Sequence, residues 1–420
     1  MLHRMDDDAA LPLLRGLLNE VIGSGNSFYL EKLKRVGFTD FNSLTIEEFR
    51  ERCPFTTKEE IAADHRNNPP FGSNLGKPIE AYSRVSRTSG TTGERIMWPD
   101  TDSGWGAMVE AWQKIYTMAG VSAGRDRIYF AFSFGPFIGF WTAFEAAAQM
   151  GCMVFPGGAA GSSERVEDII ATESTVLCCT PTYAQRLGQL MQDSGQEHGI
   201  KTVVVAGETG GSVEEVRVRI SRHWNNAEVF DHHGMTEVGP VSAQHPGTSG
   251  NLCLLQGFHY GEVIDPESGK QVAEGERGEL VLTTLRRQDS PVLRYRTGDL
   301  VCKKYYEVEG SQVLGFEGGI LGRIDDMVVV RGVNLYPAAV DSVLCRFSEV
   351  VNYQVVITSE RSMHEVTVFV ELGQCPSIEE TVLAVSDSLR NTFALRLPVE
   401  VASPGSLPVS EFKAQRWLRQ

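Results

Sequence analysis

The stretch Thr175-Val-Leu-Cys-Cys-Thr-Pro-Thr-Tyr-Ala-Gln-Arg-Leu-Gly-Gln-Leu-Met-Gln-Asp193 contains the pattern on which the fold depends. An apolar run of strand length, Thr175–Cys179, is followed by a run of helical length and pattern, Thr182–Asp193. The same order recurs on both sides of this stretch. Strands are predicted at 127–133, 152–155, 175–179 and 202–206, and helices at 141–150, 163–172, 182–193 and 212–224. Such alternation predicts parallel strands covered by helices.

The chain changes character on either side of this alternating region. The first hundred residues are predicted as helix and loop, with short helices at 43–52 and 57–66. After about residue 250, short strands and turns predict an antiparallel or barrel-like subdomain, and a βαββαβ-like unit begins near residue 323. We therefore expect an α/β fold. Its large N-terminal domain (1–322) has mixed sheets covered by helices plus the barrel-like subdomain, and its small C-terminal domain (323–420) is α+β.

Composition argues against several classes of protein. The 420 residues are 42% hydrophobic and 22% charged, as in a folded globular protein. The net charge of -15 argues against general nucleic-acid binding, which depends on Lys and Arg. The longest uncharged run, 128–144, is too short and too interrupted by Gly and Pro for a membrane span, and nothing reads as a secretory signal. The eight cysteines are scattered without a CxxC motif, so we expect a reduced, cytoplasmic protein.

The segment Ser86-Arg-Thr-Ser-Gly-Thr-Thr-Gly-Glu-Arg95 points to a ligand. Its glycines and small hydroxyl residues let backbone N–H groups and hydroxyls approach phosphate oxygens without steric conflict. It is not a Walker loop, because the GxxxxGK[ST] spacing is absent. Taken alone, the segment is equally compatible with a surface linker rich in Ser, Thr and Gly.

Four later segments follow it in order. They are Asp231-His-His-Gly-Met-Thr-Glu237, Leu293-Arg-Tyr-Arg-Thr-Gly-Asp-Leu300, the run from Gly322 to Pro337, and Leu407-Pro-Val-Ser-Glu-Phe-Lys-Ala-Gln-Arg416. This series, over more than 300 residues, resembles the acyl-adenylate-forming (AMP-forming) superfamily, with the phenylacetate-CoA ligase branch as the nearest match.

The resemblance implies an enzyme with two half-reactions. A carboxylic acid attacks ATP, with Mg²⁺, to give an acyl-adenylate and pyrophosphate. Coenzyme A then takes the acyl group as a thioester and AMP is released. Between the two steps the small C-terminal domain rotates, so we expect it to be mobile, with its hinge at Asp325.

The resemblance also assigns roles to particular residues. Lys413 is the cation that enters the site during adenylation, and its charge would offset the negative charge that develops there. Thr236 and Glu237 form the catalytic Thr-Glu pair, in which Glu237 holds Mg²⁺. Asp299 accepts hydrogen bonds from both ribose hydroxyls. The other positions expected to bind nucleotide or coenzyme A are Thr88, Ser89, Gly90, Thr91, Thr92, Gly93, Gly207, Glu208, Asp231, His232, His233, Gly234, Arg323 and Gly332.

Two positions depart from the family pattern. Glu94 stands where many relatives have lysine, so that Arg95 is an alternative source of positive charge. His233 stands where relatives usually have a tyrosine that stacks on adenine. These departures leave open a non-catalytic, nucleotide-binding relative. A second alternative is an adenylation enzyme that passes the acyl group to a carrier protein or an amine.

Aromatic residues are dense between residues 129 and 141, where the resemblance implies part of the acyl pocket. We expect an aryl or arylalkyl acid to fit such a wall better than a long fatty chain, although plain core packing is the competing interpretation. The expected substrate contacts are Phe134, Phe137, Phe140 and Met235.

Some phenylacetate-ligase relatives have a cysteine-rich structural metal site in the segment that here contains four soft ligands. The paired cysteines of that pattern are missing from this chain, so we do not expect structural zinc. The four soft ligands are His245, Cys253, His259 and Cys302.

The sequence does not decide whether the chain forms a homodimer.

Overall fold

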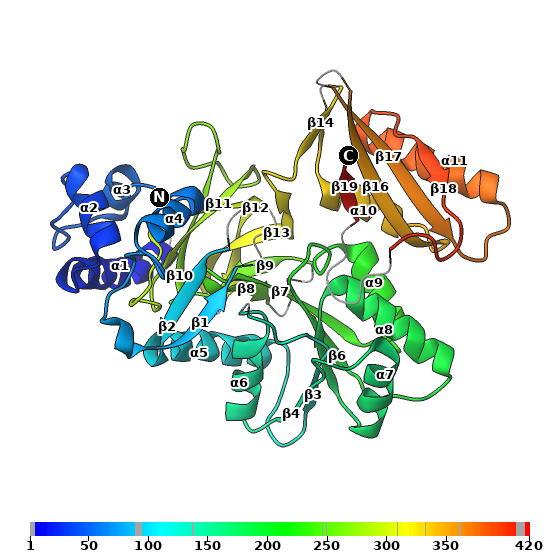
Figure 1. Cartoon of the computed structure of the whole chain (residues 1–420), viewed down its shortest axis with the longest axis horizontal. Helices are drawn as coiled ribbons and strands as arrows, with labels where there is room; N and C mark the ends of the chain where they lie inside the picture. The colour runs from blue at the N-terminus through cyan, green and yellow to red at the C-terminus, as the bar shows by residue number, and fades with distance from the viewer. Residues whose placement is uncertain are drawn as a thin grey trace.

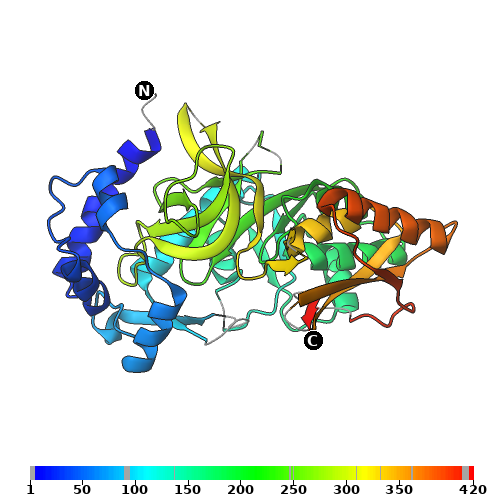
Figure 2. The same ribbon diagram turned by 90° about the horizontal axis from the view of Figure 1, so that it is seen from above.

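The computed structural model describes residues 5–88, 95–136, 138–245, 247–248, 250–308, 310–331, 333–360, 363–408 and 416–420. A large N-terminal part is built around one long mixed sheet. A smaller C-terminal part lies at one end of this large part (Figure 1). Seen from above, the first helices of the chain and the C-terminal part occupy opposite ends of the molecule (Figure 2).

The N-terminal helices form a layer of their own. Thr45 and Thr57 cap the two helices predicted there, and both helices are confirmed. Each begins just after its threonine because the side-chain oxygen accepts a backbone N–H of the first turn. Two earlier helices were not predicted individually, and they pack with Tyr260 and Leu293 of the sheet region. These elements are α1 (Met5–Gly23), α2 (Ser27–Arg35), α3 (Ile46–Arg52), α4 (Lys58–Asn67) and the short 3₁₀ helix Ile79–Ala81.

One sheet of 11 strands, in the order β10-β11-β12-β13-β9-β8-β7-β6-β5-β3-β4, runs through the large part. Neighbouring strands pair in parallel from β4 to β7, as the alternating pattern predicts. The antiparallel strands assigned to a barrel-like subdomain continue this sheet from β7 onward. The strands are β3 (Arg127–Phe130), β4 (Met153–Pro156), β5 (Val176–Cys179), β6 (Thr202–Val205), β7 (Glu228–Met235), β8 (Gly239–Gln244), β9 (Leu252–Leu254), β10 (His259–Ile264), β11 (Arg277–Thr284), β12 (Tyr295–Val308) and β13 (Ser311–Arg323).

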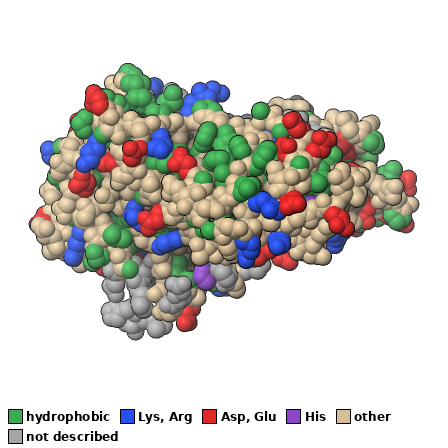
Figure 3. All heavy atoms as spheres, turned by 90° about the horizontal axis from the view of Figure 1, so that it is seen from below, with side chains coloured by type: hydrophobic (Ala, Val, Ile, Leu, Met, Phe, Trp, Pro, Cys, Tyr) green, Lys and Arg blue, Asp and Glu red, His purple; other side chains and the backbone are tan. Residues whose placement is uncertain are grey.

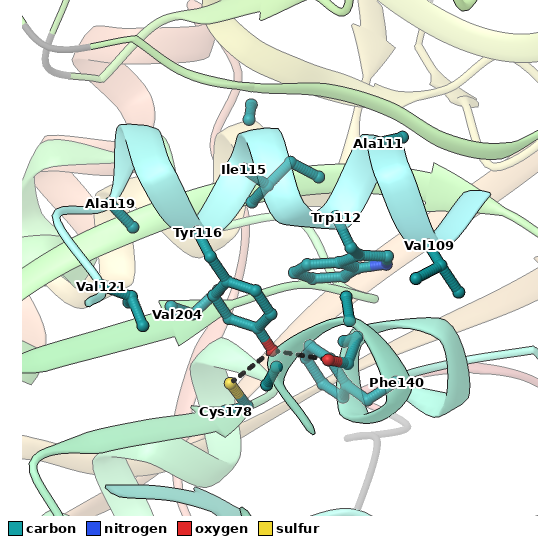
Figure 4. Close-up of a cluster of buried hydrophobic side chains, with 14 of the residues drawn as sticks. Val109, Ala111, Trp112, Ile115, Tyr116, Ala119, Val121, Phe140, Cys178 and Val204 are labelled. Atoms are coloured by element: carbon teal, nitrogen blue, oxygen red, sulfur yellow. Dashed lines mark hydrogen bonds between the residues drawn. The ribbon is translucent and has the colours of Figure 1, made fainter. Parts of the chain in front are cut away.

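Helices cover both faces of the parallel half. Alternate residues of each strand enter two separate cores, because successive side chains point to opposite faces. On one face, Trp112 and Tyr116 of α5 pack toward Phe140, and the Tyr116 hydroxyl lies 3.8 Å from Cys178 Sγ (Figure 4). The covering helices are α5 (Asp102–Met118) and α6 (Trp141–Gln149) on that face, and α7 (Ser162–Ala171), α8 (Pro181–Ser194) and α9 (Glu214–His223) on the other.

The C-terminal part has a separate core that begins at Val328. Its predicted strands and helices are present, and a four-stranded sheet has the order β18-β17-β16-β19. The last strand was not predicted, and it pairs in parallel with β16. The elements are β14 (Val328–Val330), β15 (Val333–Leu335), α10 (Pro337–Cys345), β16 (Val350–Glu360), β17 (Met363–Leu372), α11 (Ile378–Phe393), β18 (Val399–Val401) and β19 (Trp417–Arg419).

Among the described residues, no helix combines the length and the apolar character needed to span a membrane. Figure 3 shows that acidic and basic side chains are interspersed on the face seen from below, without a continuous basic surface.

Candidate active site

A hairpin of β1 (Tyr82–Arg87) and β2 (Met97–Thr101) holds the two ends of the Ser/Thr/Gly segment. Buried Thr88 closes it, because its N–H donates to the Ile96 carbonyl (3.0 Å) and its Oγ1 accepts the Ile96 N–H (2.9 Å). Arg95, the alternative cation, is exposed. The predicted phosphate-binding positions outside the described residues are Ser89, Gly90, Thr91, Thr92 and Gly93, together with Glu94.

The segments after β6 and at the end of β7 lie at the same edge of the sheet, because these strands are parallel neighbours. Gly207 has a φ of +85°, which favours glycine. Glu208 accepts the Thr182 N–H at the start of α8 (3.3 Å). Gly234 allows a close approach of strands β7 and β8, since a Cβ there would lie 2.8 Å from the Gly239 carbonyl oxygen.

Two β7 side chains predicted to bind nucleotide are directed into the protein interior. Asp231 accepts a hydrogen bond from Ser212 Oγ (2.5 Å), and burial raises the pKa of Asp231 to about 6 against the opposing effects of Ser212 and Arg217. The ring of His232 packs 4.3 Å from that of Trp112, and burial lowers the pKa of His232 to about 3. A ligand contact at these two positions would therefore come from the backbone.

Asp299, the predicted ribose acceptor, brings three of the motifs together. Its Oδ2 lies 3.1 Å from His233 Nε2, and its Oδ1 accepts from Arg323 Nη1 (3.2 Å). Asp299 and Arg323 are directly paired on β12 and β13, and Arg323 also reaches the predicted hinge residue Asp325 (3.4 Å). Asp299 itself is only 5% exposed. The structure thus joins residues up to 92 positions apart, from His233 to Asp325, in one hydrogen-bonded group.

Glu237 and Thr236 lie at the turn between β7 and β8. Glu237 is 7% exposed, and its Oε1 accepts from the Tyr295 hydroxyl (3.3 Å). Burial, with Glu237 adding to the effect, raises the pKa of Tyr295 well above its ordinary value, so that this hydroxyl keeps its proton. The carbonyl of Thr236 accepts from Arg287 Nη1 (2.7 Å).

The donor set at this turn fits Mg²⁺ that arrives with a nucleotide. Mg²⁺ usually takes one or two protein carboxylates and completes its shell with phosphate oxygens and water. Glu237 supplies one such carboxylate. Within the described ranges, no three His, Cys, Asp or Glu side chains come together as a metal cage.

The four soft ligands named from the sequence do not form a cluster of that kind either. Cys253 is buried, which raises its pKa to about 11. His259 is buried with its Nε2 2.5 Å from the Pro240 carbonyl, and burial lowers its pKa to about 4. Cys302 lies 3.9 Å from Glu317, and the backbone N–H of His245 donates to Thr248.

The predicted acyl-pocket residues have different surroundings. Phe140 is 3% exposed among the rings of Trp112, Phe130 and Phe132, which supports the core-packing interpretation for this residue. Met235 is half-buried, and Phe137 is outside the described residues. Half-buried Phe134 borders a largely apolar hollow of about 530 Å³. The hollow is lined by Ser133, Phe134, Trp141, Phe144, Pro156, Gly158 and Ala159.

Lys413 and Gly332 also lie outside the described residues, but the chain on both sides of Lys413 is anchored. The Leu407 N–H donates to Glu371 (2.6 Å). Arg416 Nη1 donates to the Tyr353 hydroxyl (2.6 Å), and Trp417 Nε1 donates to Asp341 (3.2 Å).

Sequence reasoning missed two residues next to the predicted site. Arg287 donates to the carboxylate of Asp100 as well as to Thr236, and neither residue belongs to a motif. Their pairing joins positions 187 residues apart, so no local signal could reveal it.

Comparison with known proteins identifies the family. Residues 85–285 match the AMP-binding enzymes, and residues 332–419 match the AMP-binding enzyme C-terminal domain. A phenylacetate-coenzyme A ligase of Thermus thermophilus is 30% identical, over 91% of this chain and 89% of the relative. The chain belongs to the acyl-adenylate-forming enzymes, in their phenylacetate-CoA ligase-like branch. A phenylacetate-coenzyme A ligase of Escherichia coli is 28% identical, over 88% of this chain and 86% of the relative.

Solved structures extend the similarity to the whole chain. A 2-hydroxyisobutyryl-CoA ligase in its postadenylation state, in complex with an acyl-AMP, matches with a TM-score of 0.92 at 28% identity, over 99% of this chain and 89% of that chain. The same ligase in its thioesterification state, with 2-HIB-AMP and CoA, matches with a TM-score of 0.73 at 28% identity, over 100% and 90%. The predicted fold class is confirmed, and the chain is by family an AMP-forming acid–CoA ligase.

Proposed function

We propose that the protein converts a carboxylic acid, ATP and coenzyme A into an acyl-CoA, AMP and pyrophosphate, and that the acid is aryl or arylalkyl. The main support is the match over 99% of the chain to a CoA ligase that holds an acyl-adenylate. We place the reaction in the cytoplasm, because all eight cysteines are free thiols, as expected in a reducing compartment.

In the first half-reaction, an oxygen of the carboxylate attacks the α-phosphorus of ATP and the bond to pyrophosphate breaks. The protein's part is mostly to position the reactants and to offset charge. Asp299 has acceptor capacity left on both oxygens beyond the bonds to His233 and Arg323, which suits the two ribose hydroxyls. Lys413 is assigned to the negative charge that develops around the α-phosphate.

Glu237 would hold Mg²⁺ on the nucleotide. When bound, Mg²⁺ neutralises part of the charge of the phosphate oxygens. The Tyr295 hydroxyl fixes the orientation of the Glu237 carboxylate by its hydrogen bond. In the second half-reaction, the thiol sulfur of coenzyme A attacks the acyl carbonyl carbon, the bond from that carbon to the AMP phosphate oxygen breaks, and the thiol proton passes to solvent. No cysteine of the protein is needed for either step.

The preference for an aryl or arylalkyl acid is supported by two observations. The hollow beside Phe134 is lined mainly by aromatic and small apolar residues, including Trp141 and Phe144. The related proteins of Thermus thermophilus and Escherichia coli are phenylacetate-coenzyme A ligases. The 2-hydroxyisobutyryl-CoA ligase has the same fold, so short aliphatic acids belong in any test.

The test is acid-dependent exchange of labelled pyrophosphate into ATP, with benzoates, arylacetates and short aliphatic acids. We expect exchange with at least one arylacetate or benzoate, and coenzyme A should then release AMP and form a thioester. Exchange without a response to coenzyme A would favour a carrier protein or an amine as the acceptor. No exchange with any acid would favour the non-catalytic alternative.

A further inference from the structure

A buried ion pair connects the phosphate hairpin to the Thr236–Glu237 turn. Asp100 lies on β2, and Arg287 lies in the connection between β11 and β12. Arg287 Nε donates to Asp100 Oδ1 and Nη2 donates to Oδ2, both at 2.6 Å. The side chains are 3% and 1% exposed, so water does not compete for these bonds.

The same guanidinium has a second partner. Its remaining nitrogen, Nη1, donates to the carbonyl oxygen of Thr236 (2.7 Å), and the residue after Thr236 is Glu237. One planar group therefore contacts β2 on one side and the Thr236–Glu237 turn on the other. Because Asp100 stands four residues after Ile96, which closes the hairpin on Thr88, the position of Arg287 is linked to the ends of the phosphate segment.

Other contacts fix the connection that carries Arg287 against β2. Ser290 Oγ donates to the Pro99 carbonyl (2.9 Å), and Thr101 Oγ1 donates to Asp289 Oδ2 (2.6 Å). These bonds hold the connection on the hairpin, but neither of them reaches Thr236. Apolar packing of Ile96 and Trp98 with Val238 also joins the hairpin to the turn, and Arg287 adds a hydrogen-bonded link between them.

We propose that Arg287 and Asp100 are positioning residues that set the triphosphate-binding hairpin relative to the turn that presents Thr236 and Glu237. This inference rests on the proposed function, since it assumes that both elements meet one nucleotide. Only arginine has donors in a planar fork that can bind a carboxylate with two nitrogens and a carbonyl with a third. A lysine would keep the charge beside Asp100 and lose this geometry.

Binding of Mg·ATP and of AMP, measured by calorimetry without the acid so that no turnover occurs, tests the proposal. For Arg287→Lys, the affinity for Mg·ATP should fall about tenfold, while the affinity for AMP, which lacks the β- and γ-phosphates, should change by less than about twofold. Asp100→Asn keeps an acceptor oxygen but removes the charge, and should weaken Mg·ATP binding in the same selective way. This second variant decides the matter if Arg287→Lys does not fold.

Ser290→Ala is the matched control, because it removes a buried bond between the same two elements without touching Thr236. We expect both affinities of this variant to stay at the unmodified protein's values. Equal losses for AMP and Mg·ATP in Arg287→Lys and Asp100→Asn would overturn the positioning role, as would unchanged Mg·ATP binding. If the unmodified protein binds neither nucleotide, the proposed function fails as well.

Discussion

At the scale of single residues, two aspartates from nucleotide-binding motifs have opposite surroundings. Asp299 is held between His233 and Arg323, two groups with N–H donors, and has acceptor capacity to spare. Asp231 is buried beside Ser212, and its pKa is raised to about 6. The first arrangement suits a carboxylate that binds a ligand, whereas the second disfavours the charged form of the group.

The raised pKa of Asp231 predicts a pH-dependent effect of Asp231→Asn on stability. The ordinary pKa of aspartate is 3.8, and in the folded protein that of Asp231 is about 6. Between these values the folded state binds more protons than the unfolded state, so this group lowers the free energy of unfolding as the pH rises from about 4 to 6. Asparagine has no such proton. The variant should therefore gain relative stability over that range, by about 2–3 kcal/mol above pH 6.

Urea unfolding of the two proteins at pH 4.5 and pH 7.5 measures this difference. The comparison isolates Asp231 from buried His232 and His259, whose lowered pKa values act in the opposite direction and are common to both proteins. A difference in free energy of unfolding that is the same at both pH values would contradict the prediction.

At the scale of elements, α9 of the large part and α10 of the small part are in contact. Arg219 on α9 donates to the carbonyl of Cys345 at the end of α10 (2.8 Å), and to those of Phe347 (2.9 Å) and Val350 (3.3 Å) after it. Arg346 pairs with Glu215 beside them (3.0 Å). The Cys345 carbonyl lies at the C-terminal end of α10, where a cation is favoured.

Arg219→Ala should therefore weaken the lobe arrangement seen here. We expect the rate of adenylation to fall about 5- to 10-fold, because several charge-assisted hydrogen bonds to the small part are lost. Thioester formation from a supplied acyl-adenylate should be unaffected or faster. Pyrophosphate exchange and single-turnover thioester formation measure the two steps.

Arg222, exposed on the same helix, provides the control. Arg222→Ala should leave both half-reactions at their original rates. If Arg219→Ala slows both half-reactions equally, the contact is structural and does not favour one arrangement of the lobes.

The elements that the sequence predicts well are those with an uninterrupted apolar run. The strands 175–179 and 202–206 are buried on both faces, so their composition identifies them. The last strand, Trp417–Arg419, has three residues, two of them half-buried and one exposed, so it lacks such a run. It forms because β16 offers an open edge, which is a property of the tertiary structure.

In the candidate site too, residues within a local sequence pattern could be predicted, and residues that depend on tertiary contacts could not. Motif residues such as Asp299, Glu237 and His233 could be named from the sequence because their spacing resembles a family. Arg287 and Asp100 could not, since their importance comes from a contact between distant segments. The sequence also could not distinguish Phe140, which lies in the core, from Phe134, which borders a hollow.

At the scale of the whole molecule, the arrangement of the two parts carries information about the reaction. Coverage of the chain is nearly the same in both comparisons, yet the TM-score is 0.92 with the postadenylation state and 0.73 with the thioesterification state. The structure as a whole is therefore more similar to the postadenylation state of that ligase than to its thioesterification state. For the second step we propose a different placement of the small part.

A buried ion pair connects the N-terminal helices to the antiparallel half of the sheet. Arg294 joins Glu262 through two nitrogens (2.9 and 2.8 Å) and donates to the carbonyl of Cys53 (2.8 Å) in the N-terminal layer. The N-terminal helices are thereby fixed to the strands that lead to Asp299.

The most direct test of this account measures both half-reactions in Lys413→Ala. Pyrophosphate exchange should fall by roughly 10²–10³-fold, since a cation aimed at developing charge is lost. Thioester formation from a supplied acyl-adenylate and coenzyme A should proceed at the rate of the unmodified protein, because we assign Lys413 to the first step alone. An equal loss in both half-reactions would contradict the account of two lobe arrangements with separate tasks.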